Sequence, residues 1–181
     1  MVNCARGIGL GLTDSPADDV RVHADMSCPN PGHADDYRGT VRNNVVFVDD
    51  DRVFDPASGF DTGIALAAAC EATVVHNTVY STRAPFSSIE WRFDATSGLV
   101  GNNLVSHNLM ERTAGTAAAA GNLDGAGAEH FVDAAAGGLS LTIGSAAVDA
   151  WAELGSAAPD DDVEAEPRSD GAPDGGADER S

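Results

Sequence analysis

The chain has 181 residues, which is enough for one ordinary domain or a short array of repeats. It carries 29 acidic residues against 10 basic ones, and this balance argues against a nucleic-acid partner, because neutralising phosphates requires clustered basic side chains. No run of about twenty apolar residues is present, so we expect no membrane span, and no signal peptide is visible at the N-terminus.

Residues 1–36 form the first predicted segment. Glycine alternates with apolar residues over positions 6–12, which is typical of a short strand. Positions 13–36 are rich in Asp, Pro and Gly, so we expect a long surface loop there. This loop carries an acidic cluster that consists of Asp14, Asp18 and Asp19.

One pattern recurs over residues 37–155: an alternating apolar strand, a bend of small residues, and then a short Val-x-Asn motif. The clearest copies are residues 63–80 and 88–105. Repeats of this length are typical of a solenoid, in which each unit stacks only on its neighbours. Weaker copies lie at residues 6–12, 39–47 and 120–123.

The spacing of equivalent residues supports this repeat. Ile64 and Ile89 are 25 residues apart, and Asn77 and Asn103 are 26 apart. The step from Asn44 to Asn77 is longer, at 33 residues, which indicates an insertion after the first of them. We therefore expect equivalent residues to stack from one repeat to the next.

Asparagine has a physical reason to recur at the bends. A sharp bend needs left-handed backbone angles, which Asn tolerates better than other residues with a side chain. Stacked Asn side chains can also hydrogen-bond from one repeat to the next. The alternative is a β-sandwich whose ordinary hairpin turns carry the same residues.

Residues 156–181 differ in composition from the rest of the chain. Apolar residues almost vanish, and Asp, Glu, Gly and Pro replace them. Composition alone predicts a solvated acidic tail.

The copies at 63–80 and 88–105 resemble the right-handed parallel β-helix repeat family, the pectate-lyase-like solenoids. The likeness covers roughly residues 37–179, because many bacterial members end with a similar closing segment. That closing segment resembles residues 144–150, 161–168 and 172–179 of this chain.

The closing segment departs from the family pattern at three points. Trp151 stands where Gly is usual, and Gly175 replaces the usual Ile. Ala165, between two glutamates, stands where the family has a Gly in an acidic-Gly-acidic turn. These departures bear on how tightly the terminal cap packs.

The resemblance implies an all-β fold, a right-handed parallel β-helix of roughly four to six coils with an irregular acidic C-terminal tail. Residues 1–36 would be a partial first coil and its loop, 37–155 the coils, and 156–181 the closing segment. We expect the chain to be the C-terminal part of a longer ancestral protein, and a helix capping its N-terminal end would contradict this.

The strand around residue 90 is the best candidate for chemistry. If Ile89, Trp91 and Phe93 point inward, Glu90 and Arg92 point outward together. Such a pair could bind or deprotonate a uronic acid sugar, since lyase chemistry needs a base and a cation against the carboxylate. The alternative is a solvent-facing ion pair.

Other candidates surround this strand. Ala65 and Ala67 would leave a shallow floor on the preceding coil, and Arg83 lies in the loop before the strand. His76 and His107 lie beside the Asn bends, where a His is either an acid/base or a turn cap.

Acidic groups offer a possible calcium site. Asp49, Asp50, Asp51 and Asp55 in the insertion supply enough oxygen ligands for Ca²⁺, although without EF-hand spacing. The alternative is a solvated acidic loop. Glu129-His130 is a weaker candidate pair.

Three cysteines, Cys4, Cys28 and Cys70, show no zinc-site spacing. In an exported protein the candidate disulfides are Cys28–Cys70 and Cys4–Cys28, and the alternative is three free thiols.

Two functions remain open at this stage. The first is an extracellular or envelope β-helix protein that binds carbohydrate or a cell-surface glycan without catalysis, as a monomer or as part of a longer β-helix. The second is a polysaccharide lyase or glycoside hydrolase that acts on an acidic glycan.

Overall fold

The computed structural model describes residues 1–12, 22–55, 57, 59–168 and 173–179. The fold is mostly β, with strands arranged in parallel sheets. Among the described residues, one short α-helix, α1 (Asp51–Phe54), and four 3₁₀ turns accompany the strands. The 3₁₀ turns are η1 (Pro31–His33), η2 (Ala128–His130), η3 (Ala134–Ala136) and η4 (Gly155–Ala157). Within the described ranges, no helix has the length and apolar character that crossing a membrane requires.

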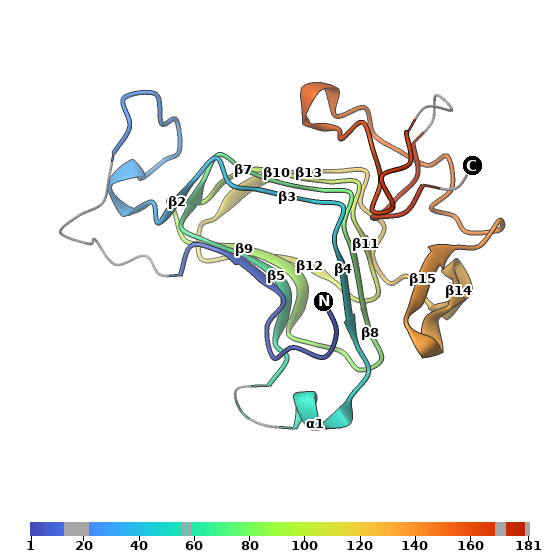
Figure 1. The fold of residues 1–181 in the computed structure, drawn as a ribbon. Helices are drawn as coiled ribbons and strands as arrows, with labels where there is room; N and C mark the ends of the chain where they lie inside the picture. Colours follow the sequence, from blue (N-terminus) through green and yellow to red (C-terminus); the bar gives the residue numbers. More distant parts are fainter. Residues whose placement is uncertain (13–21, 56, 58, 169–172, 180–181) are drawn as a thin grey trace.

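Three parallel sheets contain most of the strands (Figure 1). The first sheet has the order β1 (Ile8–Leu10), β5 (Thr62–Ala67), β9 (Ser87–Arg92), β12 (Leu109–Arg112). The second has the order β13 (Thr116–Ala120), β10 (Ser97–Gly101), β7 (Ala72–Val75), β3 (Thr40–Arg42). The third has the order β11 (Leu104–Val105), β8 (Thr78–Ser81), β4 (Val45–Val48). A small parallel pair, β2 (Asp36–Tyr37) and β6 (Ala69–Cys70), lies where the first sheet leads into the second.

The chain passes through the first, second and third sheets in the same order on successive passes. Ile64 pairs with Ile89 in register, which confirms the predicted step of 25 residues. Ile8 in turn pairs with Ile64, so the glycine-rich stretch at the start of the chain is a strand, as predicted. In Figure 1 the strands of successive passes lie almost on top of one another.

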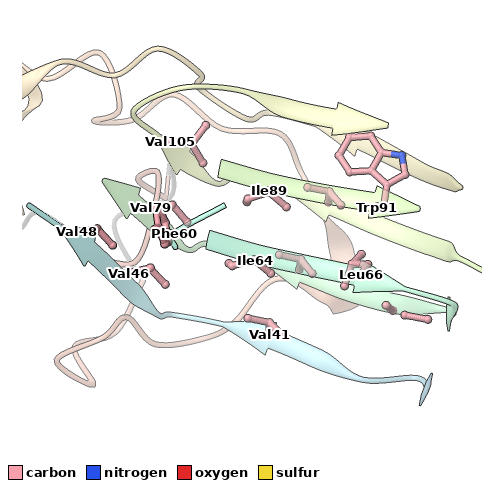
Figure 2. Close-up of a cluster of buried hydrophobic side chains, with 14 residues drawn as sticks. Val41, Val46, Val48, Phe60, Ile64, Leu66, Val79, Ile89, Trp91 and Val105 are labelled. Carbon is pink, nitrogen blue, oxygen red and sulfur yellow. The ribbon is translucent and has the colours of Figure 1, made fainter. Parts of the chain in front are cut away.

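Aliphatic side chains from the three sheets meet in one core (Figure 2). Val41, Val74 and Val100 form an in-register column across the second sheet. Ile89 and Trp91 contribute from the first sheet, where alternate residues of a strand face the core. Small and medium side chains suit this interior because the sheets lie close together.

Two neighbouring positions shape the bend between the second and third sheets. The first is left-handed, with φ of 53° at Asn43, 51° at His76 and 52° at Asn102. The second carries the Asn ladder, in which each side-chain amide donates to the carbonyl oxygen of the next Asn. The distances are 3.0 Å from Asn44 to Asn77, 2.9 Å from Asn77 to Asn103, and 2.9 Å from Asn103 to Asn122. The predicted hydrogen bonding between stacked Asn side chains is thereby confirmed, but Asn77 and Asn103 do not themselves have the left-handed angles, which belong to the residue before each of them.

Insertions occupy the other two bends. The extra residues between Asn44 and Asn77 lie after β4 and include α1. A loop before β2 is joined to β6 by a disulfide between Cys28 and Cys70, one of the two predicted pairings. Cys4 is a free, half-buried thiol.

The segment after β13 leaves the parallel arrangement. β14 (Phe131–Asp133) and β15 (Gly138–Leu141) form an antiparallel hairpin. Leu139, Leu141 and Ile143 alternate with smaller or polar residues in the sequence, which predicts a buried row. Leu139 and Leu141 are buried, but Ile143 is 84% exposed because the strand ends at Leu141, so the prediction is wrong for Ile143.

The acidic closing segment is packed, contrary to the expectation from composition. Asp162 and Asp174 are 4% and 0% exposed, and the Arg168 guanidinium lies 2.8 Å from the carboxylate of Glu179. Arg168 also donates to the backbone carbonyl of Asp161 and to three others, those of Asp174, Gly176 and Ala177. Composition misses this because it does not show that Arg168 and backbone amides of the same segment compensate the buried carboxylates.

Trp151 and Gly175 pack directly against each other. A Cβ atom at Gly175 would lie 1.9 Å from Cζ2 of Trp151, so the indole occupies the space of the missing side chain. Both residues are held by Ala147, whose carbonyl accepts from the Gly175 amide at 3.0 Å and the Trp151 indole at 3.3 Å. The backbone at Ala165 is strained, since this residue has a left-handed φ of 63°.

Candidate functional site

Glu90 and Arg92 lie on the outer face of the first sheet, which is the face opposite the core. Their neighbours Ile89 and Trp91 belong to the core, so alternation along β9 turns the two charged residues outward. The register places Ala65 beside Glu90 on the preceding strand, as the sequence predicts. The first sheet therefore brings two of the four candidate catalytic residues together.

Glu90 is much less accessible than predicted, at 3% exposed. Its Oε2 accepts hydrogen bonds from Ser87 Oγ at 3.1 Å and from Arg112 Nη1 at 2.9 Å. Arg92 Nη1 lies 3.7 Å from Oε1 of the same carboxylate. Glu90 is thus the shared anionic partner of two arginines.

Arg112 is the residue that sequence reasoning missed. Arg112 lies on β12 and pairs in register with Arg92 on the neighbouring strand β9. No alternation marked it, because the strand Leu109–Arg112 has two apolar residues followed by two charged ones. The side chains of Arg92 and Arg112 are 33% and 35% exposed, so both guanidinium groups reach solvent.

Each of these guanidinium groups lies against a phenylalanine ring. Cζ of Arg92 is 4.2 Å from the ring centroid of Phe93, and Cζ of Arg112 is 4.4 Å from that of Phe86. Cation–π contact fixes the plane of a guanidinium without using its hydrogen-bond donors. Nε of Arg92 is buried and has no hydrogen-bond partner among the described residues. We call this set of Glu90, Arg92 and Arg112 with their two rings the arginine row.

Arg83 lies elsewhere. Its guanidinium pairs with Asp55 at 3.1 Å and Asp51 at 3.5 Å, and it lies 5.1 Å from the Phe54 ring. These contacts hold it to the insertion after β4. The structure does not bring Arg83 to Glu90.

His76 is fully buried at the left-handed position of its bend, where the neighbouring passes have Asn43 and Asn102. Its Nε2 accepts from Nδ2 of Asn102 at 3.1 Å. Burial, and secondarily the positive charge of Arg168, lowers the pKa of His76 to about 4. A buried, neutral imidazole in this place serves the turn and does not reach a ligand on the first sheet.

The other histidine candidates hydrogen-bond to serines. Nδ1 of His107 lies 2.8 Å from Ser106 Oγ and 3.2 Å from Ser81 Oγ, and burial lowers its pKa. Nδ1 of His130 lies 2.9 Å from Ser145 Oγ, and its Nε2 lies 3.8 Å from exposed Glu129. These hydrogen bonds connect His107 to the preceding pass at Ser81, and His130 to the segment after β15 at Ser145.

The expected calcium ligands are dispersed among other partners. Asp50 pairs with Arg52 at 2.6 Å, and Asp49 accepts from Nδ2 of Asn3 at 2.9 Å. Asp51 and Asp55 both pair with the Arg83 guanidinium. The acidic cluster at Asp14, Asp18 and Asp19 lies outside the described residues.

A different carboxylate group lies in the closing segment. Oxygen atoms of Asp162, Glu164 and Asp178 lie within 4.8 Å of one another. Desolvation, followed by the charges of the other two, raises the pKa of Glu164. Desolvation also raises the pKa of Asp178. Since backbone amides already bond to Asp162 and Asp178, the group is explained as part of the packed closing segment.

Comparison of the chain with protein-family models, with curated proteins and with solved structures finds no match.

Proposed function

We propose that the chain is a right-handed parallel β-helix that binds an acidic glycan on the outer face of its first sheet without cleaving it. The repeated passage through three parallel sheets and the Asn ladder support this architecture. Each pass adds one strand to the outer face of the first sheet, and a surface built in this way suits an extended polymer.

The observation that carries this proposal is the sharing of one carboxylate by two arginines. Elsewhere Arg38 and Arg83 each pair with two carboxylates, whereas Arg92 and Arg112 both face Glu90. The arginine row therefore keeps an excess of positive charge on a chain with a net charge of −19. Partly exposed guanidinium groups with free donors are suited to the planar carboxylate of a uronic acid.

Binding is favoured over lyase or hydrolase activity because Glu90 is already engaged. A general base must have a free acceptor within reach of the proton that it removes. Glu90 is buried, and its Oε2 accepts from both Ser87 and Arg112. In this proposal Glu90 holds the arginines in place and does not contact the sugar.

The disulfide supports an extracellular or envelope location. Disulfides persist in oxidising compartments and are rare in reducing ones. The bond between Cys28 and Cys70 fastens a loop that lies next to the glycan-binding face.

The test is calorimetric titration of the full chain with polygalacturonate, alginate and chondroitin. We expect at least one to bind, and Arg92→Gln and Arg112→Gln each to weaken its binding by about tenfold, the worth of one charge-assisted hydrogen bond. Binding should also weaken as salt is added, because both partners are charged.

Arg52→Gln is the matched control. It also removes one arginine charge, but its side chain is 89% exposed and pairs with Asp50 in the insertion after β4. Equal losses in the control and in the two test variants would show a diffuse charge effect and refute the site. Ultraviolet absorbance from unsaturated uronate products would refute the claim that the protein does not cleave its ligand.

A further inference from the structure

A pocket of about 330 Å³ lies where the first sheet turns toward the second. Three segments line it: His33 from the disulfide-bonded loop, Phe93 and Asp94 from the bend after β9, and Thr113 and Ala114 from the bend after β12. Of these residues, Phe93 also contacts the arginine row, because its ring supports Arg92. The pocket therefore adjoins one end of the arginine row.

Phe93 occupies a costly backbone position. Its φ is 72°, in the left-handed region, where a bulky aromatic residue is an outlier. The in-register positions on the neighbouring strands, Ala68 and Thr113, are also left-handed at 56° and 43° but carry small side chains. Strain of this kind costs about 1–3 kcal/mol and is concentrated at ligand sites. The Arg92 guanidinium lies over this ring, and the ring also packs against the apolar cluster around the disulfide, so Phe93 contributes an apolar part of the pocket wall.

Polar groups with spare hydrogen-bonding capacity surround that ring. Oγ1 of Thr113 accepts from the Phe93 amide at 3.2 Å, so its own hydrogen is left to donate. The exposed carboxylate of Asp94 accepts from Nδ2 of Asn30 at 3.2 Å and retains free lone pairs. His33 adds a residue with an imidazole to the lining. These groups match the hydroxyls of a sugar.

The charge of the pocket selects between sugars. Asp94 is the charged carboxylate among the lining residues, and it repels a second carboxylate. Arg92, whose guanidinium lies over the Phe93 ring, by contrast attracts one. Acidic and neutral sugars are thus favoured at adjacent positions.

We propose that this pocket binds a neutral sugar residue next to the uronate held by Arg92 and Arg112, so that the ligand is a mixed glycan of acidic and neutral sugars. The inference rests on the proposed function and narrows its substrate class. Phe93 forms an apolar part of the wall, and Asp94, Thr113 and His33 bind the hydroxyls. The disulfide holds the wall that carries His33, since both Cys28 and Phe93 belong to the same small apolar cluster.

The test uses three probes in calorimetric titrations of the full, oxidised chain: glucuronate, diglucuronate, and a disaccharide of glucuronate linked to xylose. We expect the mixed disaccharide to bind about tenfold more tightly than glucuronate, the worth of one or two additional hydrogen bonds. Diglucuronate should show no such gain. His33→Ala should abolish the gain, and Asp94→Asn should let diglucuronate bind as tightly as the mixed disaccharide.

His23→Ala is the matched control, because His23 lies on the same loop but stacks on Tyr37 at 4.9 Å. If glucuronate binds and the mixed disaccharide binds no better, or if His33→Ala keeps the gain, the pocket inference is wrong while the proposed function stands. If the disaccharide needs His33 but tolerates loss of both arginines, the pocket stands and the arginine row is wrong. If no probe binds, both are wrong.

Discussion

Trp151 and Gly175 offer the sharpest test of how the closing segment packs. A Cβ at Gly175 would lie 1.9 Å from Cζ2 and 2.2 Å from Cη2 of Trp151, far inside van der Waals contact. Gly176 has a left-handed φ of 81°, but Gly175 does not. An Ile at position 175 therefore clashes with the indole without straining the backbone. We therefore expect Gly175→Ile to destabilise the fold by about 3 kcal/mol, the upper range for overpacking.

The complementary change creates a hole. Trp151→Gly removes a half-buried indole and its hydrogen bond to Ala147, and should cost roughly 3 kcal/mol. In the double variant the Ile side chain enters the vacated space, so the two losses should not add. We expect the double variant to recover about 2 kcal/mol relative to the sum of the single variants, within the range of coupling for residues in contact.

The assay is urea unfolding followed by circular dichroism, which does not depend on the tryptophan that is removed. Gly176→Ala is the control, because it adds a side chain beside the pair at a strained backbone position that Trp151→Gly cannot relieve. A double variant whose loss equals the sum of the single losses, to within about 0.5 kcal/mol, would refute the compensation.

Three further changes test the bends and the closing segment. Ala165→Gly should stabilise the fold by about 1 kcal/mol in urea unfolding, because it relieves the left-handed φ of 63°, and an unchanged midpoint would contradict the strain. The lowered pKa of His76, about 4 against an ordinary 6.5, means that the unfolded chain binds this proton first as pH falls. Its contribution to stability is therefore complete above about pH 6.5 and lost by about pH 4, in total about 3 kcal/mol. His76→Asn should remove that pH dependence, since Asn occupies the same left-handed position at Asn43 and Asn102; thermal melts with an unaltered pH profile would count against it. Arg168→Met should cost about 3–5 kcal/mol in urea unfolding by leaving Glu179 buried without its counter-charge, and a loss below about 1 kcal/mol would show that the pair is dispensable.

The repeating part of the fold was predictable because its signals are local. Alternation with a period of two identified Ile64, Ile89 and Trp91 as core residues, and equal spacing set their register. The recurring Asn residues predicted where the bends and the ladder lie, although the left-handed position is the residue before each ladder Asn and is His76 in one pass. The same alternation placed Glu90 and Arg92 on one face.

What surrounds those two residues could not be read along the chain. Arg112 reaches Glu90 from the next pass, and Arg83 is drawn away by carboxylates in an insertion. Such pairings depend on which passes become neighbours and on loop paths, and periodicity does not describe either. The sequence therefore predicted the pair of Glu90 and Arg92, and only the tertiary structure shows that Glu90 is buried and shared with Arg112.

The closing segment shows the same division. Its order of motifs was visible in the sequence, and so were its departures at Trp151, Ala165 and Gly175. Composition nevertheless predicted a solvated tail, because acidic residues are ordinarily hydrated. Only the tertiary structure supplies Arg168 and the backbone amides that make burial of these carboxylates favourable, and only it places the indole of Trp151 in the space that Gly175 leaves.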